Sequence, residues 1–231
     1  STKSVTVRST SLIIEMCVEG KMNRLVDRTV TDFVDECSMD SPAPGGGSVA
    51  ALAGAQGAAL ANMVANLTVG KKGYEAVWEE MKQIAAEAQT IKDKFMAAID
   101  RDTDAFNKVM DAFKMPKATD EQKIARTQAI QDGTKQATLV PLEVLKMVPR
   151  TLELAKAVAE RGNKNSASDS GVAALSLRTA AEGAWLNVRI NLASITDEEF
   201  KGCVTAEGRG ALSKSRELAD AVDCVVDKSI G

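Results

Sequence analysis

SPAPGGGSVAALAGAQGAALANMVANLTVG, residues 41–70, is a run of thirty residues without a charged side chain. The residue before a proline is disfavoured in the α conformation, so Pro42 and Pro44 predict a break before a helix. That helix is predicted to run from Ser48, its N-cap, to about Thr68. Because small residues and three amides interrupt its apolar character, we interpret it as a buried core helix rather than a bilayer span, which needs about 20 strongly apolar residues.

Helical spacing of apolar residues continues on both sides of this segment. Upstream, the pattern over residues 30–37 predicts a helix that follows an arm or linker, residues 1–28. Downstream, residues 74–113 predict a very long helix that contains at most one break. Pro116 closes this helix, because proline cannot continue the hydrogen-bond ladder.

Three further helices are predicted from their N-caps, the first and last of which belong to capping boxes. These N-caps are Thr119, Asp169 and Thr196. Pro141 and Pro149 predict a kink or a split in the first of the three helices. The sequence therefore predicts an all-α protein, a multihelical up-and-down bundle or array of five or six long helices, with one helical domain over residues 29–231.

The composition excludes several classes of function. The chain has 231 residues and a formal net charge of −3, with charges of both signs interspersed, so neither nucleic acid nor a membrane is an expected partner. It contains no histidine, which excludes Ser-His-Asp triads and histidine-ligated zinc. We expect no metal site and no tightly bound cofactor. Any chemistry must come from carboxylates, lysines, hydroxyls, thiols or backbone groups.

The four cysteines lie far apart in the sequence, without C-x-x-C spacing. We interpret them as small buried side chains, which suits a reducing compartment and a cytoplasmic protein. They are Cys17, Cys37, Cys203 and Cys224.

Asp102 departs most clearly from the apolar pattern of the long helix. At 100° per residue it lies about 20° from Phe95 and about 40° from Phe106, and so it faces inward, whereas Asp100 and Asp104 face solvent. One interpretation is structural, a buried carboxylate bound to a helix terminus or an arginine. The other is functional, because a carboxylate in an apolar seam has a perturbed pKa.

Two pairs of asparagines lie at i, i+4 spacing on the least charged helices, Asn62 with Asn66 and Asn187 with Asn191. Each pair shares one face of its helix, and buried amides need hydrogen-bond partners. Either the pairs satisfy one another across the bundle, or they form a polar strip that binds a heterocyclic ligand, with Arg189 nearby.

Gly45, Gly46 and Gly47, together with Ser48, form the start of the charge-free helix. Their backbone N–H groups either hold an anion or simply begin a helix. A dinucleotide site is not expected, although the spacing formally matches G-x-G-x-x-A, because no strand precedes it. Lys71, beyond the end of this helix, is either a solvated charge or a contact for a polyanionic tail.

Six blocks of sequence together resemble one known family. They are SPAPGGGSVAAL (41–52), MVANLTVGKK (63–72), DRDTDAFN (100–107), VPLEV (140–144), GNKNSASD (162–169) and NVRINL (187–192). The chain resembles the cyclodeaminase domain of formiminotransferase-cyclodeaminase, a family that also includes bacterial methenyltetrahydrofolate cyclohydrolases. The resemblance spans about residues 29–228.

The resemblance implies an all-helical homodimer that converts 5-formiminotetrahydrofolate to 5,10-methenyltetrahydrofolate and ammonia, a step of histidine breakdown. Asp102 is similar in place to the family's catalytic aspartate. The implied substrate-binding residues are Gly45, Gly46, Gly47, Ser48, Asn66, Lys71, Asn163, Asp169, Asn187, Arg189 and Asn191. The substrate is a tetrahydrofolate derivative, and a glutamate formiminotransferase domain or protein is a further implied partner. Two alternatives stay open: a methenyltetrahydrofolate cyclohydrolase, and a non-catalytic folate-binding or assembly module.

Overall fold

A computed structural model describes residues 24–231 of the chain, which form helices and, within that range, no strand. The all-α prediction is therefore confirmed. The chain divides into two compact units, residues 1–41 and residues 42–231. Of the first unit, residues 1–23 lie outside the described residues, and with them most of the predicted arm. Its described part contains a 3₁₀ helix, Leu25–Asp27, and α2, Val30–Cys37, whose N-cap Thr29 accepts a hydrogen bond from the backbone of Asp32.

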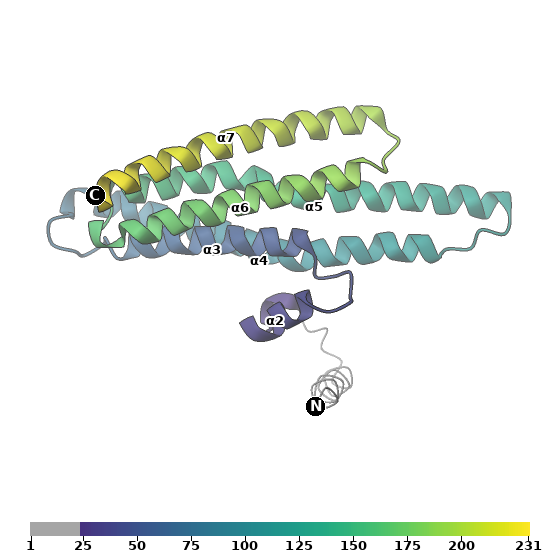
Figure 1. Cartoon of the computed structure of the whole chain (residues 1–231), viewed down its shortest axis with the longest axis horizontal. Helices are drawn as coiled ribbons and strands as arrows, with labels where there is room; N and C mark the ends of the chain where they lie inside the picture. Colours follow the sequence, from purple (N-terminus) through teal and green to yellow (C-terminus); the bar gives the residue numbers. More distant parts are fainter. Residues whose placement is uncertain (1–23) are drawn as a thin grey trace. The chain divides into compact units, whose positions relative to one another are not determined.

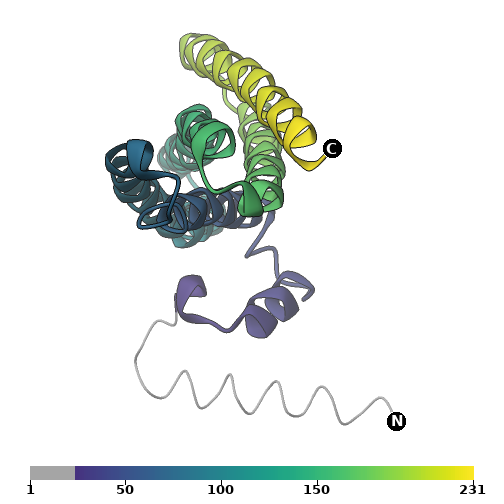
Figure 2. The same ribbon diagram turned by 90° about the vertical axis from the view of Figure 1, so that its left-hand side faces the viewer.

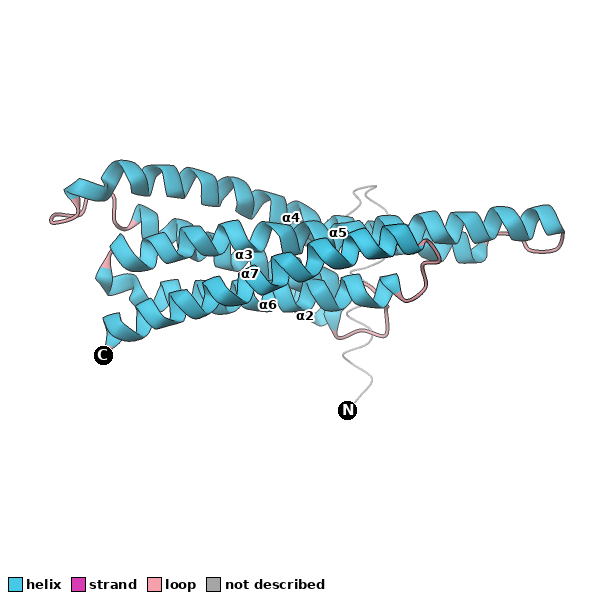
Figure 3. Ribbon diagram, turned by 90° about the horizontal axis from the view of Figure 1, so that it is seen from above, coloured by secondary structure: helices cyan, strands magenta, loops and turns pink. Residues whose placement is uncertain are grey.

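The second unit contains the five long helices that the apolar periodicity predicts (Figure 1). Successive helices of this unit run in opposite directions, as Figures 1 and 3 show. Short 3₁₀ turns, Glu75–Val77 and Lys164–Ser166, precede the second and the fourth of them. The five are α3 (Gly46–Asn66), α4 (Trp78–Lys114), α5 (Asp120–Arg161), α6 (Ala167–Leu192) and α7 (Glu198–Ile230).

The charge-free helix α3 packs against α4, α5 and α6 (Figure 2). Its glycines permit close contact: a Cβ at Gly54 would lie 2.6 Å from the ring of Phe95, and one at Gly57 would lie 2.5 Å from the side chain of Leu177. By length and composition α3 could cross a membrane, but 61% of its most apolar window is buried inside the bundle. That burial agrees with the predicted core helix.

The predicted start of α5 is correct, whereas the predicted cap of α7 is one residue too early. Thr119 caps α5 in a capping box with Gln122, as predicted. Asp197, and not Thr196, caps α7, where its carboxylate accepts the backbone N–H of Phe200. The Thr196 hydroxyl and backbone N–H instead donate to the side chain of Gln131 on α5. A contact between helices has thus displaced the local cap.

The predictions that Ser48 and Asp169 are N-caps are wrong. α3 begins after Gly45, because the two glycines before Ser48 already adopt the helical conformation. α6 begins after Ser166, because the preceding 3₁₀ turn leads directly into it, and this places Asp169 inside the first turn. Neither helix has a cap from the side chain of its own N-cap residue.

Of the kink or split predicted at Pro141 and Pro149, the split does not occur, because α5 continues through both prolines. Pro141 has no N–H to donate to the carbonyl four residues earlier, that of Ala137. The Nδ2 of Asn191 on α6 donates to this carbonyl at 3.0 Å. A side chain of the neighbouring helix thus supplies the missing hydrogen bond. α4 is likewise unbroken.

The cysteines are not the buried side chains that were predicted. Cys37, Cys203 and Cys224 are free and exposed, and Cys17 lies outside the described residues. α7 packs against α5 and α6 through one of its faces only. Apolar spacing alone does not distinguish the buried from the exposed edge of such a peripheral helix.

Candidate active site

Asp102, on α4, lies against the first turn of α3. A Cβ added to Gly47 would lie 2.2 Å from its Oδ1, so the glycine backbone lies directly over the carboxyl group. The Ser48 Oγ lies 3.3 Å from the Asp102 Oδ2 and 2.8 Å from the carbonyl oxygen of Ile99, and the backbone N–H of Ser48 donates to the carboxylate. Asp102 therefore caps a helix that has no cap of its own.

Burial raises the pKa of Asp102 above its ordinary value, and the smaller effect of the two hydrogen bonds from Ser48 opposes the rise. No ion pair to this carboxylate occurs in the described part of the chain, so no cation offsets the cost of charging it. A carboxyl group whose pKa is shifted toward neutrality is suited to accept and return a proton. Asp104 is exposed, as predicted, whereas Asp100 is half-buried.

Thr103 is a neighbour of this site that the helical pattern did not single out. Its Oγ1 lies 3.3 Å from the Oγ of Ser48, so the two hydroxyl groups and the carboxyl group of Asp102 form one small polar cluster. Thr103 can be recognised as a neighbour of this site only once the structure shows that Asp102 and Ser48 are in contact.

Asn187, on α6, reaches the first turn of α3 from another side. A Cβ at Gly46 would lie 3.2 Å from its Nδ2, which donates to the carbonyl of Gly183 at 2.8 Å. Asn187 also lines an open hollow of about 420 Å³, and Asp102 is not among the residues that line it. Gly47 thus contacts Asp102 and Gly46 contacts Asn187, but of these two side chains only Asn187 lines the hollow. The other lining residues are Leu186, Arg189 and Ile190.

Arg189 also lines a second hollow, of about 280 Å³, between α6 and α7. The ring of Trp185 reaches the α7 backbone there, since a Cβ at Gly208 would lie 2.3 Å from it. Neither Arg189 nor Arg209, which also lines this hollow, makes an ion pair within residues 24–231. Sequence reasoning found Arg189 but missed Trp185 and Arg209, because their proximity depends on how two helices pack.

Asn191 lies one turn beyond Asn187, but its amide serves the backbone of α5. Its Nδ2 donates to the carbonyl of Ala137, next to Pro141, as described above. The structure therefore gives Asn191 a structural partner, whereas its predicted contact with a ligand stays a prediction.

The other predicted binding residues lie far from Asp102, at the opposite end of α3 and α6. Asn66 is 18 residues from Ser48 on α3, and Asp169 is 18 residues from Asn187 on α6. At 1.5 Å per residue, each separation is about 27 Å. Within one chain, the sequence-predicted site is thus two clusters rather than one.

Lys71 and Asn163 are the centre of this second cluster. The Nζ of Lys71 donates to the Oδ1 of Asn163 at 2.8 Å, and the backbone N–H of Asn163 donates to the Oγ1 of Thr68 at 2.9 Å. Lys71 is half-buried, its Nζ lies 6.0 Å from the ring centroid of Tyr74, and it makes no ion pair with a described carboxylate. The α3–α4 and α5–α6 connections are thereby joined around a positioned cation.

In the asparagine pair of α3, Asn66 is exposed and Asn62 is half-buried. Asn66 donates to the Oδ1 of Asn62 at 2.7 Å, and Asn62 donates to the side chain of Gln89 at 3.1 Å. The pair therefore satisfies itself locally, which is the simpler of the two interpretations.

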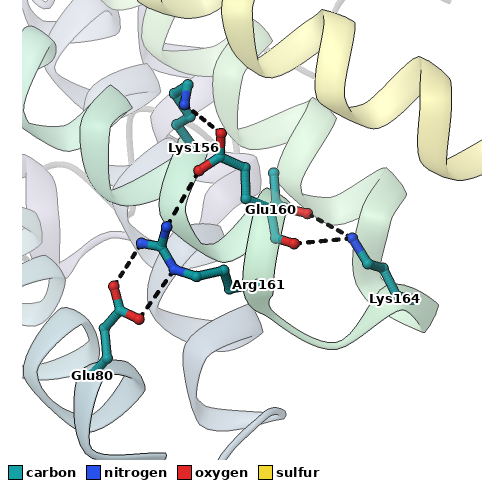
Figure 4. A network of polar contacts seen from close by, with 6 residues as sticks. Glu80, Lys156, Glu160, Arg161 and Lys164 are labelled. Carbon is teal, nitrogen blue, oxygen red and sulfur yellow. Dashed lines mark hydrogen bonds and ion pairs between the residues drawn. The ribbon is translucent and has the colours of Figure 1, made fainter. Parts of the chain in front are cut away.

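A network of ion pairs surrounds the same end of the bundle (Figure 4). Arg161 binds Glu80 at 2.6 Å and Glu160 at 3.4 Å, and Lys156 also binds Glu160. The Nζ of Lys164 donates to two carbonyl groups in the last turn of α5, including that of Glu160 at 3.1 Å. Exposed pairs contribute only about 0–1 kcal/mol each, so the network's main effect is to fix the start of α4 against the end of α5.

The described residues contain no group of three or more His, Cys, Asp or Glu that could hold a metal ion. The chemistry of the Asp102 cluster is therefore that of one carboxyl group, hydroxyl groups and backbone N–H groups.

Comparison with known proteins assigns the chain to a family. A model of the formiminotransferase-cyclodeaminase family matches residues 29–209. The chain belongs to this family. It is 39% identical over 196 residues to a methenyltetrahydrofolate cyclohydrolase of Methylorubrum extorquens, a match that covers 85% of this chain and 94% of that protein. This formiminotransferase-cyclodeaminase family member thus covers nearly the whole length of that relative.

Two further relatives have names that include cyclodeaminase. The formimidoyltransferase-cyclodeaminase of Rattus norvegicus is 38% identical over 191 residues, which cover 82% of this chain but only 35% of the rat protein. A crystal structure of a formiminotetrahydrofolate cyclodeaminase from Thermotoga maritima has the same fold, with a TM-score of 0.79 and 31% identity over 88% of this chain and 98% of that one. The chain spans about a third of the rat protein, so that protein's whole activity does not transfer directly.

Proposed function

We propose that this chain is a formimidoyltetrahydrofolate cyclodeaminase, which converts 5-formiminotetrahydrofolate to 5,10-methenyltetrahydrofolate and ammonia. The observation that carries the proposal is Asp102, a half-buried carboxyl group with a raised pKa beneath a side-chain-free helix turn. Cyclodeamination moves a proton between two nitrogens, and in a chain without histidine a carboxyl group of this kind is suited to the task. The names of the relatives support the substrate class.

In this mechanism the lone pair of N10 forms a bond to the formimino carbon, and the carboxylate of Asp102 accepts the proton that N10 loses. Asp102 then returns this proton to the formimino nitrogen. With one further proton from solvent, the bond between that nitrogen and carbon breaks and ammonia leaves. The carbon remains bonded to N5 and N10 as the methenyl cation, so that atoms and charge balance.

The residues around Asp102 have positioning roles in this proposal. Gly45, Gly46 and Gly47 present only backbone, which permits the one-carbon bridge to approach the carboxyl group closely. The amide of Asn187 binds the heterocycle from the neighbouring helix, and the guanidinium of Arg189 binds a glutamyl carboxylate of the substrate.

A methenyltetrahydrofolate cyclohydrolase is the second candidate, because the relative matched over 94% of its length carries that name. The same site would then add water to the methenyl carbon and break the bond between that carbon and N5. Asp102 would accept one proton of the water, the second would pass to N5 as its bond to the carbon breaks, and 10-formyltetrahydrofolate would be the product. The two reactions differ in substrate and in the direction in which the methenyl absorbance changes.

Two parallel assays on the purified chain distinguish these functions. With 5-formiminotetrahydrofolate, cyclodeamination releases ammonia while methenyl absorbance appears; with 5,10-methenyltetrahydrofolate, hydrolysis removes that absorbance and releases no ammonia. Asp102→Asn should lower turnover by roughly 10²–10⁴-fold, the range usual for a positioned acid or base. The matched control is Asp104→Asn, which removes an exposed carboxylate two residues away and should change turnover little. Folate binding without turnover in either assay would identify a non-catalytic module.

The cellular setting is also a proposal. Three exposed free thiols support a reducing compartment, the cytoplasm. The rat relative, whose name joins a transferase to a cyclodeaminase, supports a glutamate formiminotransferase as the partner that supplies the substrate in histidine breakdown.

A further inference from the structure

The hydroxyl group of Ser48 has more hydrogen-bond acceptors around it than it can serve. Its Oγ lies 2.8 Å from the carbonyl oxygen of Ile99 and 3.3 Å from the Oδ2 of Asp102. The Oγ1 of Thr103 is a third neighbour, also at 3.3 Å. A hydroxyl group has one proton to donate and two lone pairs that accept. Ser48 therefore donates fully to only one of these oxygens at a time.

The charge of Asp102 decides which oxygen that is. A hydrogen bond to a charged acceptor is roughly twice as strong as one to a neutral acceptor. A carboxylate therefore competes successfully with the peptide carbonyl of Ile99, whereas a protonated carboxyl group has no such advantage. The shorter distance to Ile99 is the arrangement that suits a protonated Asp102. A charged Asp102 should attract the proton of Ser48 to its Oδ2.

Both arrangements leave the buried polar groups paired. The side chain of Ser48 is fully buried, so water does not replace a lost partner. When the hydroxyl turns to Asp102, the carbonyl of Ile99 keeps its helical bond from the backbone N–H of Thr103, four residues further along α4. When the hydroxyl turns to Ile99, the backbone N–H of Ser48 still donates to the carboxyl group. Neither position of the hydroxyl is therefore opposed by an unpaired group.

Thr103 supplies the second donor of this cluster. The proton of Ser48 points either to Ile99 or to Asp102, so the hydroxyl of Thr103 must be the donor between the two hydroxyl groups. A hydroxyl that accepts one hydrogen bond donates a stronger one, because bonds in a chain polarise each other. The chain from Thr103 through Ser48 thus favours the charged form of Asp102.

Charged side chains around Asp102 act elsewhere. α3 contains none, Arg101 binds Glu143 at the surface between α4 and α5, and Arg189 lines a hollow that Asp102 does not line. Among the described residues, Ser48 therefore provides the interactions that favour the carboxylate against the effect of burial. The charged residues next to Asp102 on its own helix are Asp100, Arg101 and Asp104.

We propose that the hydroxyl of Ser48 is a switch that follows the proton of Asp102, with Thr103 as its second donor. While Asp102 is charged, Ser48 donates to Oδ2 and leaves Oδ1 to take the proton that N10 loses. Once Asp102 is protonated, the hydroxyl turns to the carbonyl of Ile99, and it turns back when the proton is returned. No proton passes through the hydroxyl groups, so both are positioning residues.

This inference rests on the proposed folate chemistry and names two positioning residues for it. The full burial of Ser48 favours this role over the direct contact with substrate that the family resemblance implies. Thr103, which is half-buried, was not among the residues implied by the resemblance.

Ser48→Ala and Thr103→Val test the switch, because each removes a hydroxyl group with little change of shape. In a chain labelled with ¹³C at the aspartate carboxyl groups, the NMR resonance that disappears in Asp102→Asn reports the titration of Asp102. Ser48→Ala should raise its midpoint by about one pH unit, since the lost bond to the carboxylate contributes roughly tenfold. Thr103→Val should raise it by about 0.3 unit, because only the strengthening of that bond is lost.

Two further variants control for shape and burial. Thr103→Ser keeps the hydroxyl and should restore the wild-type midpoint. Ser215→Ala removes another fully buried hydroxyl, which donates to the carbonyl of Ala211 on α7 at 2.8 Å, and should leave the titration of Asp102 unchanged. An unchanged or lowered midpoint in Ser48→Ala would overturn the proposal. The role of Thr103 fails if Thr103→Ser titrates like Thr103→Val.

The pH dependence of folate turnover is the second readout. The acidic limb of kcat should move to higher pH by the same amounts, because less Asp102 is then charged at a given pH. KM and the kcat reached at higher pH should change little, since neither hydroxyl touches the substrate. A purely structural role would lower kcat equally at every pH, and that result would contradict the proposal.

The two readouts separate failure of the switch from failure of the proposed function. If the wild-type chain turns over neither folate but the NMR midpoints shift as expected, the function fails and the switch stands. If turnover is present and the midpoints do not move, the switch fails and the function stands. Should Ser48→Ala not fold, Thr103→Val decides by the same NMR measurement, because its position is only half-buried.

Discussion

Gly47→Ala is the substitution that tests most directly how the glycine turn serves Asp102. The added Cβ would lie 2.2 Å from Oδ1, 2.5 Å from Cγ and 2.5 Å from Oδ2 of the carboxyl group, where ordinary contact begins at 3.4 Å. The carboxyl group must therefore move by about 1.2 Å. Nothing in the sequence of α3 compensates for this movement, because the helix has no side-chain cap of its own.

The effects on stability and on turnover should differ in size. Alanine in place of a helical glycine stabilises by about 0.5–1 kcal/mol. Loss of the cap from Asp102 costs about 0.5–2 kcal/mol, so that the net change should lie between about 0.5 kcal/mol of added stability and about 1.5 kcal/mol of lost stability. A displacement of about 1 Å at a reacting group lowers the rate by about 10²-fold. The variant should thus fold normally and lose most of its activity.

Urea denaturation and a turnover assay on the same preparation test this expectation. The matched control is Gly210→Ala on α7, where an added Cβ meets nothing within 4 Å. It should gain about 0.5–1 kcal/mol of stability and keep full turnover. Full turnover in Gly47→Ala would refute the reasoning, because the carboxyl group could not then be held where the structure places it.

Three other substitutions test single features. The pKa of Asp102 is raised on folding, so its contribution to stability is present below its ordinary pKa of 3.8 and is lost as the pH rises through the folded value. Asp102→Asn should therefore melt at a higher temperature than wild type at pH 7, with the difference vanishing below about pH 3.8. Asn191→Ala leaves the carbonyl of Ala137 unpaired next to Pro141 and should cost about 1–3 kcal/mol in urea denaturation. Thr119→Ala removes a capping box and should cost about 1 kcal/mol by the same measurement.

Much of the fold is readable from the sequence, because amphipathic periodicity and proline positions are local signals. The existence and order of the five long helices and the inward position of Asp102 follow from spacing alone. Two of the errors share a cause. Thr196 bonds to Gln131 on α5 and does not cap its own helix, and Pro141 does not split a helix whose free carbonyl accepts a hydrogen bond from Asn191. Each depends on a side chain from another helix, which local patterns do not contain.

The candidate site was predictable as a set of residues but not as a place. Spacing put Asp102 and the glycine turn on separate helices without showing that Gly47 covers the carboxyl group. The family resemblance grouped Lys71 and Asn163 with the asparagines of α6 in one binding site, although about 27 Å of helix separates the two groups.

Asp102, the proposed acid–base group, can be compared with one other carboxyl group of the chain. In the part that the structure describes, two carboxyl groups have a raised pKa, Asp102 and Asp223. Burial is the main cause at Asp223 as well, and nearby Asp220 and Asp227 add to the rise. Arg178, however, lies 3.6 Å from Asp223 and favours its charged form. Asp102 has no such cation among residues 24–231, and the backbone of Gly47 lies against its carboxyl group. In a chain without histidine, that combination supports the proposal that Asp102 is the group that exchanges a proton with the substrate.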